Sequence, residues 1–152
     1  MRRIASFSVD HRYIREGIYL SRVDGDVTTY DLRTRRPNCE DYMDNRTMHS
    51  VEHLFATMVR NSELADDVLY FGPMGCQTGF YLLIRNADHA RVLRVVREIV
   101  GCIAVYDGPM PGCSEMECGN YRSLDLESAR RECRRYAEAI RDGSVERLAY
   151  PT

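Results

Sequence analysis

The stretch Met48–Phe55 reads Met-His-Ser-Val-Glu-His-Leu-Phe, and it restricts the fold more than any other part of the chain. His49 and His53 are four residues apart, and Glu52 follows His49 by three. On an α-helix these offsets place the three side chains on one side, with neighbouring Cβ atoms about 5–6 Å apart. Two imidazoles one turn apart can bind one metal ion, and a carboxylate beside them can move protons. The sequence therefore predicts a metal-binding helix; the plainer alternative is a solvated helix face.

The residues around this motif repeat with a helical period, which predicts one buried stripe made of Met48, Val51, Leu54, Phe55, Met58 and Val59. The helix is expected to begin near Thr47, with Asp44, Asn45 or Thr47 as its N-cap. His49, Glu52 and His53 lie on the adjoining stripe. The predicted metal cleft therefore lies at the edge of the core.

The rest of the chain alternates between strand and helix patterns. Strands are predicted at 17–23, 27–32, 68–71, 80–84 and 103–106, and helices at 88–100 and 124–141. Asp24-Gly25-Asp26 separates the first two strands and predicts a hairpin. With no internal repeat or linker-like segment, we expect one α+β domain over residues 1–152, with a mostly antiparallel sheet of about four strands packed against three to four helices.

Charge and hydropathy exclude two classes of partner. The formal net charge is −2 and the arginines are interleaved with acids, so no nucleic-acid partner is expected. No window approaches the 18 or so apolar residues of a membrane span, so no membrane partner is expected either. The two early arginines are not followed by the apolar run of an export signal. We therefore expect a cytoplasmic protein.

Six cysteines are many for 152 residues, and without an export signal they favour metal ligation or thiol chemistry over disulfides. Cys102 lies in an apolar run and Cys133 in a helix pattern, which predicts that both are buried. Cys76, Cys113 and Cys118 lie in turn-rich sequence and stay candidates for chemistry.

A metal held by two histidines needs a third protein ligand and keeps one open position. Cys118, in Glu-Cys-Gly-Asn, is the favoured third ligand, and Cys113 is the alternative. Such a centre acts as a Lewis acid on a carbonyl or hydroxyl. Glu52 is expected to act as a base beside the metal rather than as a ligand.

The turn Gly72–Gly79, Gly-Pro-Met-Gly-Cys-Gln-Thr-Gly, is not a phosphate loop because no Gly-Lys-Ser/Thr follows. It places Cys76 at the mouth of a strand, where positive charge nearby would favour the thiolate. With Glu52, this thiol would give the site two acid/base groups, which suits proton abstraction next to a carbonyl. The alternative is that Cys76 is buried for packing.

Three segments together resemble the S-ribosylhomocysteine lyase (LuxS) family, which makes the precursor of autoinducer-2: residues 49–53, 72–79 and 117–119. Ser6-Phe7, Asp10-His11 and Tyr30-Asp31-Leu32-Arg33 also agree, so the resemblance covers essentially the whole chain. The Pro-Met-Gly-Cys-x-Thr-Gly segment is highly specific, whereas an inverted zinc-protease motif shares His-x-x-Glu-His.

The resemblance implies a metal held by His49, His53, Cys118 and water, namely Fe²⁺, which Zn²⁺ or Co²⁺ often replaces. It implies S-ribosylhomocysteine as the substrate, two enolisations that move the ribose carbonyl from C1 to C3, and a β-elimination. The products would be homocysteine and 4,5-dihydroxypentane-2,3-dione. Glu52 and Cys76 would be the proton-transfer groups.

The resemblance also implies a homodimer with its active sites at the interface. Ser6, His11 and Arg33 match positions that bind the ribose end of the substrate, and Arg60 matches one near the amino-acid end. Tyr70-Phe71-Gly72 departs from the Asp-Ile-Ser of several members, so an expected acidic group is missing there. Two rival hypotheses are a small metalloprotease, which leaves Cys76 and Cys118 unexplained, and a non-catalytic metal-binding regulator.

Overall fold

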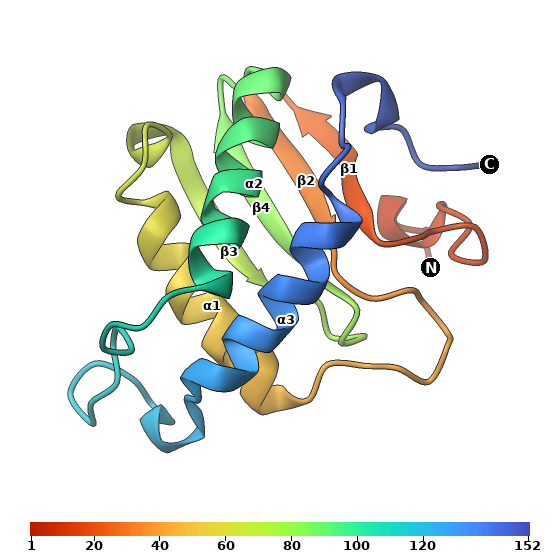
Figure 1. The fold of residues 1–152 in the computed structure, drawn as a ribbon. Helices are drawn as coiled ribbons and strands as arrows, with labels where there is room; N and C mark the ends of the chain where they lie inside the picture. The colour runs from red at the N-terminus through yellow and green to blue at the C-terminus, as the bar shows by residue number, and fades with distance from the viewer.

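Four antiparallel strands form one sheet in the computed structural model, which describes residues 1–152 (Figure 1). The strands are β1 (Gly17–Asp24), β2 (Val27–Arg33), β3 (Val68–Pro73) and β4 (Gly79–Arg85), in the spatial order β1-β2-β4-β3. Two sequence-adjacent hairpins are therefore joined through β2 and β4. The prediction of an α+β fold with an antiparallel sheet of about four strands is confirmed.

The first hairpin follows from its turn sequence. Asp24 pairs with Val27, and Gly25 has a φ of +62° between them. Glycine adopts this left-handed conformation without the steric cost that a Cβ brings. The predicted hairpin is confirmed.

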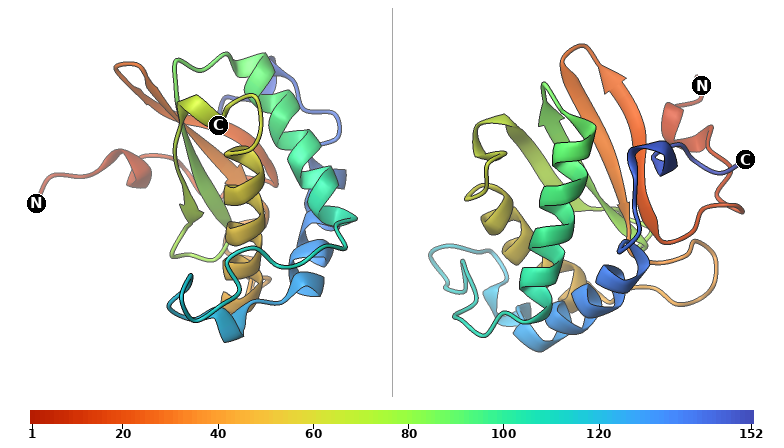
Figure 2. Two further views of the ribbon diagram at one scale, coloured as in Figure 1. Left: turned by 90° about the vertical axis from the view of Figure 1, so that its left-hand side faces the viewer. Right: turned by 45° about the horizontal axis from the view of Figure 1, so that its top comes forward.

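Three helices cover one face of the sheet: α1 (Asn45–Val59), α2 (His89–Ala104) and α3 (Leu126–Ala139) (Figures 1 and 2). Each begins after an aspartate that accepts a hydrogen bond from a backbone N–H three residues later; these caps are Asp44, Asp88 and Asp125. Such a cap satisfies one of the N–H groups that the first turn leaves free. Of the three N-caps considered for the metal-motif helix, the structure uses Asp44.

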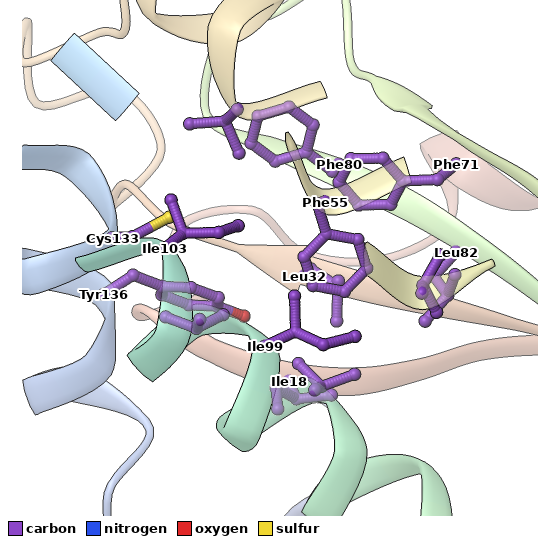
Figure 3. Packing of buried hydrophobic residues seen from close by; sticks show 14 of the residues in the cluster. Ile18, Leu32, Phe55, Phe71, Phe80, Leu82, Ile99, Ile103, Cys133 and Tyr136 are labelled. Atoms are coloured by element: carbon purple, nitrogen blue, oxygen red, sulfur yellow. The ribbon is translucent and has the colours of Figure 1, made fainter. Parts of the chain in front are cut away.

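The core lies between the sheet and the helices (Figure 3). Phe71 of β3 stacks on Phe55 of α1 and on Phe80 of β4, with ring centroids 4.3 and 5.1 Å apart. Cys133 of α3 is 2% exposed, as predicted. Burial of each of the three phenylalanine side chains contributes roughly 1.5–3 kcal/mol to the free energy of unfolding. This packing holds α1 rigidly, and with it His49, Glu52 and His53, which lie on the stripe next to the buried one.

The strand predicted at 103–106 is wrong, because Ile103 and Ala104 are the last residues of α2. The β-branched and aromatic residues of 103–106 suggested a strand, but the buried Ile103 and Ala104 continue the helical period of Ile99 and Val100. The same error misplaced Cys102, which was predicted to be buried and is exposed on the outer face of the helix.

The two ends of the chain lie on the β1 side of the molecule (Figure 1). The backbone of Leu148 accepts a hydrogen bond from Leu20 in β1, so the C-terminal residues run beside this strand. The N-terminal segment instead projects from the body of the protein, and Phe7 is 65% exposed on it (Figure 2). None of the helices combines the length and the hydropathy of a membrane-spanning segment.

Candidate metal centre

Two side chains of α1 and one from a distant loop meet at one point. His49, His53 and Cys118 each offer one ligand atom, and these atoms lie within 4.8 Å of one another. All three residues are half-buried. The alternative ligand, Cys113, is not in this group; its Sγ lies 3.8 Å from the carbonyl oxygen of Tyr121.

Each imidazole donates one hydrogen bond to the loop 107–123, and these bonds fix the orientation of both rings. His53 Nδ1 lies 2.9 Å from the carbonyl oxygen of Pro111, which can only accept, so Nδ1 carries the proton. His49 Nδ1 lies 2.6 Å from Ser123 Oγ, and Ser123 donates its own proton to the carbonyl of Asn120. In both rings Nε2 therefore keeps its lone pair for a metal, which is the usual arrangement of metal-binding histidines.

Gly112 determines how closely this loop approaches the helix. Its φ is +67°, and a Cβ built on it would lie 2.9 Å from His53 Nδ1. A side chain at this position would therefore be strained and would displace the imidazole. The absence of a Cβ lets the Pro111 carbonyl reach His53.

The spacing of the donor atoms fits a metal ion. Cys118 Sγ lies 3.4 Å from His49 Nε2, and two such ligands on a tetrahedral ion would be about 3.6 Å apart, given metal–sulfur and metal–nitrogen distances of roughly 2.3 and 2.1 Å. The backbone N–H of Asn120 donates to Cys118 Sγ at 3.4 Å, which fixes the position of the sulfur. Burial, and then His53 beside it, lower the pKa of His49 and favour the neutral, metal-binding imidazole.

Glu52 lies beside this group on the open side of α1. It lines a cavity of about 260 Å³ together with His53, Ala56, Thr57, Pro111 and Gly112. A carboxylate here can exchange a proton with a molecule in the cavity without leaving its helix.

Cys76 is held separately, in the turn between β3 and β4. It is exposed, so the alternative of a thiol buried for packing does not apply. Its Sγ lies 3.0 Å from Thr78 Oγ1, which in turn accepts a hydrogen bond of 2.8 Å from Arg33. The turn and the N-terminal half of α1 lie at the same end of the molecule (Figures 1 and 2).

The four residues predicted to contact substrate are spread over the chain. Ser6 is exposed and His11 half-exposed on the projecting N-terminal segment. Arg60 is exposed at the C-terminal end of α1 and donates to the Ala56 carbonyl. Arg33 is 2% exposed and donates to Asp31 as well as to Thr78. No hydrogen bond joins any two of these four residues.

The sequence reasoning missed the residues that orient the ligands and the thiol: Pro111, Gly112, Ser123 and Thr78. From the sequence alone, Thr78 was expected only as part of the turn Gly72–Gly79, and no role was expected for the other three. The Gly-Pro-rich loop from 107 to 120 was a signal that backbone approaches something closely there.

The comparisons with known proteins agree with this geometry. A sequence model of the S-ribosylhomocysteinase (LuxS) family matches residues 4–146. S-ribosylhomocysteine lyase from Desulfotalea psychrophila is 42% identical over the full length of both chains. The enzymes of the same name from Finegoldia magna and Borreliella afzelii are 40% and 39% identical, over at least 99% of each chain. The chain belongs to the LuxS family.

Membership of the LuxS family confirms the resemblance inferred from the three segments, all of which lie inside the matched residues. LuxS proteins are S-ribosylhomocysteinases, so the chain is an enzyme that cleaves a carbon–sulfur bond. The group of His49, His53 and Cys118 fits the metal that such an enzyme uses.

Proposed function

We propose that this chain performs the S-ribosylhomocysteine lyase reaction with a metal held by His49, His53 and Cys118, and with Glu52 and Cys76 as its proton carriers. The observation that carries the proposal is the convergence of the three ligand atoms within 4.8 Å, beside the cavity that Glu52 lines.

The donor set supports a first-row divalent metal, because two imidazoles and a thiolate suit Fe²⁺, Co²⁺ and Zn²⁺. We propose Fe²⁺, one ion per chain, with Zn²⁺ or Co²⁺ as substitutes. When bound, the ion supplies Lewis acidity toward the carbonyl and hydroxyl oxygens of the sugar. Metal analysis of protein purified without oxygen tests its identity.

The reaction needs protons moved at adjacent carbons of the ribose. Two enolisations carry the carbonyl from C1 to C3, and elimination across C4–C5 then expels homocysteine and leaves 4,5-dihydroxypentane-2,3-dione. Each enolisation removes a proton from one carbon and returns one to its neighbour, without net oxidation. We assign these transfers to the Glu52 carboxylate and the Cys76 thiolate.

A homodimer would explain where the substrate contacts come from. Ser6 and His11 lie on a segment that projects from its own chain, with Ile4 and Phe7 exposed on it. The sheet face opposite the helices carries exposed Tyr70. We propose that two chains pair through these surfaces, so that Ser6 and His11 reach the partner's site, while Arg33 contacts the ribose end and Arg60 lies near the amino-acid end.

We further propose that the enzyme acts in the cytoplasm. All six cysteines are free, which suits a reducing compartment.

Release of homocysteine tests the function. Metal-loaded, reduced protein is mixed with S-ribosylhomocysteine, and the new thiol is followed with a chromogenic thiol reagent. We expect turnover that stops when the metal is removed by a chelator. No thiol release from metal-loaded protein would contradict the proposal; cleavage of a peptide substrate instead would favour the metalloprotease.

A further inference from the structure

A continuous series of polar groups runs from the C-terminal segment to the thiol of Cys76. Tyr150 donates its hydroxyl proton to Asp31 Oδ2 at 2.7 Å. Arg33 donates to both oxygens of Asp31, at 3.1 and 2.6 Å, and its third nitrogen donates to Thr78 Oγ1 at 2.8 Å. Thr78 Oγ1 lies 3.0 Å from Cys76 Sγ. Asp31, Arg33 and Thr78 are all buried, and the series ends at an exposed sulfur.

Chemistry fixes the direction of the last hydrogen bond. A guanidinium can only donate, so Thr78 Oγ1 is the acceptor for Arg33. A hydroxyl has a single proton, and Thr78 is 1% exposed, so water does not compete for it. The remaining neighbour of Oγ1 is Cys76 Sγ. If the thiol donated to the second lone pair of Oγ1, the buried hydroxyl proton would have no acceptor, so the geometry favours donation from Thr78 to Cys76 Sγ.

We propose that Thr78 is a positioning residue for Cys76, whose hydroxyl donates to Sγ and favours the thiolate, and that Arg33, Asp31 and Tyr150 orient this hydroxyl. The inference deepens the role proposed above for Cys76 and rests on it. A hydrogen bond to a charged sulfur is stronger than one to a neutral thiol, so the contact favours the ionised form.

Other contacts hold the Thr78 backbone, so its hydroxyl can be removed without releasing the turn. The carbonyl of Thr78 accepts from the backbone N–H groups of Thr34 and Arg35, at 3.1 and 2.9 Å. Gln77 exchanges two hydrogen bonds of 3.0 Å with the backbone of Met43. Replacing Thr78 with valine keeps its shape and these contacts and removes only the hydroxyl.

The far end of the series lies outside the segment that the family model matches, which ends at residue 146. Tyr150 stacks on Tyr19 with ring centroids 5.0 Å apart, and the hydroxyl of Tyr19 donates to Arg15 rather than to Asp31. The two tyrosines therefore form a matched pair: one hydroxyl belongs to the series and its stacked neighbour does not.

Alkylation of individual cysteines tests the proposal without substrate. The metal-loaded protein is treated with iodoacetamide at neutral pH, and peptide mass spectrometry follows Cys76, with exposed Cys102 on α2 as the internal reference. We expect Thr78→Val to slow alkylation of Cys76 relative to Cys102 by about tenfold. In a separate assay with substrate, the same variant should lower kcat by a similar factor with little change in KM. Thr78→Ser should retain most of the alkylation rate and most of kcat. Tyr150→Phe should slow Cys76 by a smaller factor, and Tyr19→Phe should leave it unchanged.

Alkylation of Cys76 at the wild-type rate in Thr78→Val would overturn the inference. So would a Thr78→Ser protein as slow as Thr78→Val, because the methyl group and not the hydroxyl would then matter. If the wild-type protein released no homocysteine but Thr78→Val still slowed alkylation selectively at Cys76, the proposed function would fail while the hydrogen-bonding role of Thr78 would stand.

Discussion

The metal centre and the Cys76 turn are held in opposite ways. The three metal donors are half-buried and converge on one point, and each imidazole is oriented by one hydrogen bond that it donates to the loop 107–123. Cys76 is exposed, and its sulfur lies at the end of a series of side chains from β2, the turn and the C-terminal segment, of which Asp31, Arg33 and Thr78 are buried. Metal binding depends on three donor atoms that meet at one point. The position of the Cys76 thiol depends instead on several hydrogen bonds, each of which acts through the next.

This difference predicts two kinds of mutational response. A metal site loses its ion when one of three ligands is removed, because the remaining two cannot complete the coordination. A hydrogen-bonded series loses its effect in steps, because each member acts only through the next. The variants below separate the two, from the largest expected effect to the smallest.

Removing the sulfur ligand should give the largest effect. Cys118→Ala is expected to lose its bound metal and its turnover, since His49 and His53 alone leave the ion two protein ligands. Metal analysis of the purified protein measures the loss. Cys113→Ala is the matched control from the same loop and should keep about one ion per chain. Metal retained by Cys118→Ala and lost by Cys113→Ala would transfer the ligand role to Cys113.

Removing a proton carrier should abolish turnover while the metal stays. Cys76→Ala and Glu52→Gln are each expected to lower kcat by about 10²–10⁴-fold, the usual contribution of a positioned acid or base. Metal content and the circular dichroism spectrum should match those of the wild-type protein. Either variant at full turnover would remove that residue from the mechanism.

Gly112→Ala should weaken the metal centre without removing a ligand. Its new Cβ would press on His53 at a φ that alanine rarely adopts, so we expect metal affinity to fall by about 10–100-fold. Competition with a chromogenic chelator gives the affinity. Gly101→Ala on α2 adds its Cβ to open space and should leave the affinity unchanged. Equal affinities in the two variants would show that the Pro111 carbonyl does not position His53.

Removing the cap of α1 should have the smallest effect on the site. Asp44→Ala is expected to lower the free energy of unfolding by about 1 kcal/mol at pH 7, with the metal retained. Hydrogen bonds from Thr47 lower the pKa of Asp44 below its unfolded value of about 3.9, so this contribution is complete above that pH. It is lost as the pH falls through the lower folded value. Urea unfolding should therefore show a difference between the proteins that is constant from about pH 5 to 7 and shrinks below about pH 4.

The parts of this fold that were predictable from sequence are local. The His-x-x-Glu-His spacing defines one helix face, and Asp24-Gly25-Asp26 defines one turn, so both were found without knowledge of distant residues. The failure at 103–106 was also local: β-branched residues favour strands, but the packing of Ile99 and Ile103 in the core continued the helix.

The contacts that orient the site join residues far apart in the sequence. Ser123 reaches His49 across 74 positions, and Arg33 reaches Thr78 across 45. The second contact exists only because β2 pairs with β4 in the register that sets Arg33 opposite Gly79. Such pairing depends on the whole sheet, so no short motif could reveal that Thr78 orients the thiol.

The ion pair between Asp31 and Arg33 is buried on both sides, at 0% and 3% side-chain exposure. Replacing a buried pair of this kind by well-packed apolar residues is often neutral or stabilising by about 1–4 kcal/mol, whereas removing one partner alone is costly. A search for more heat-resistant variants would therefore favour joint apolar replacement of Asp31 and Arg33. Such a protein would fold well and melt late, yet its Cys76 would have lost the charge that orients Thr78. Thermal tolerance and turnover are thus expected to oppose each other at this one pair of positions.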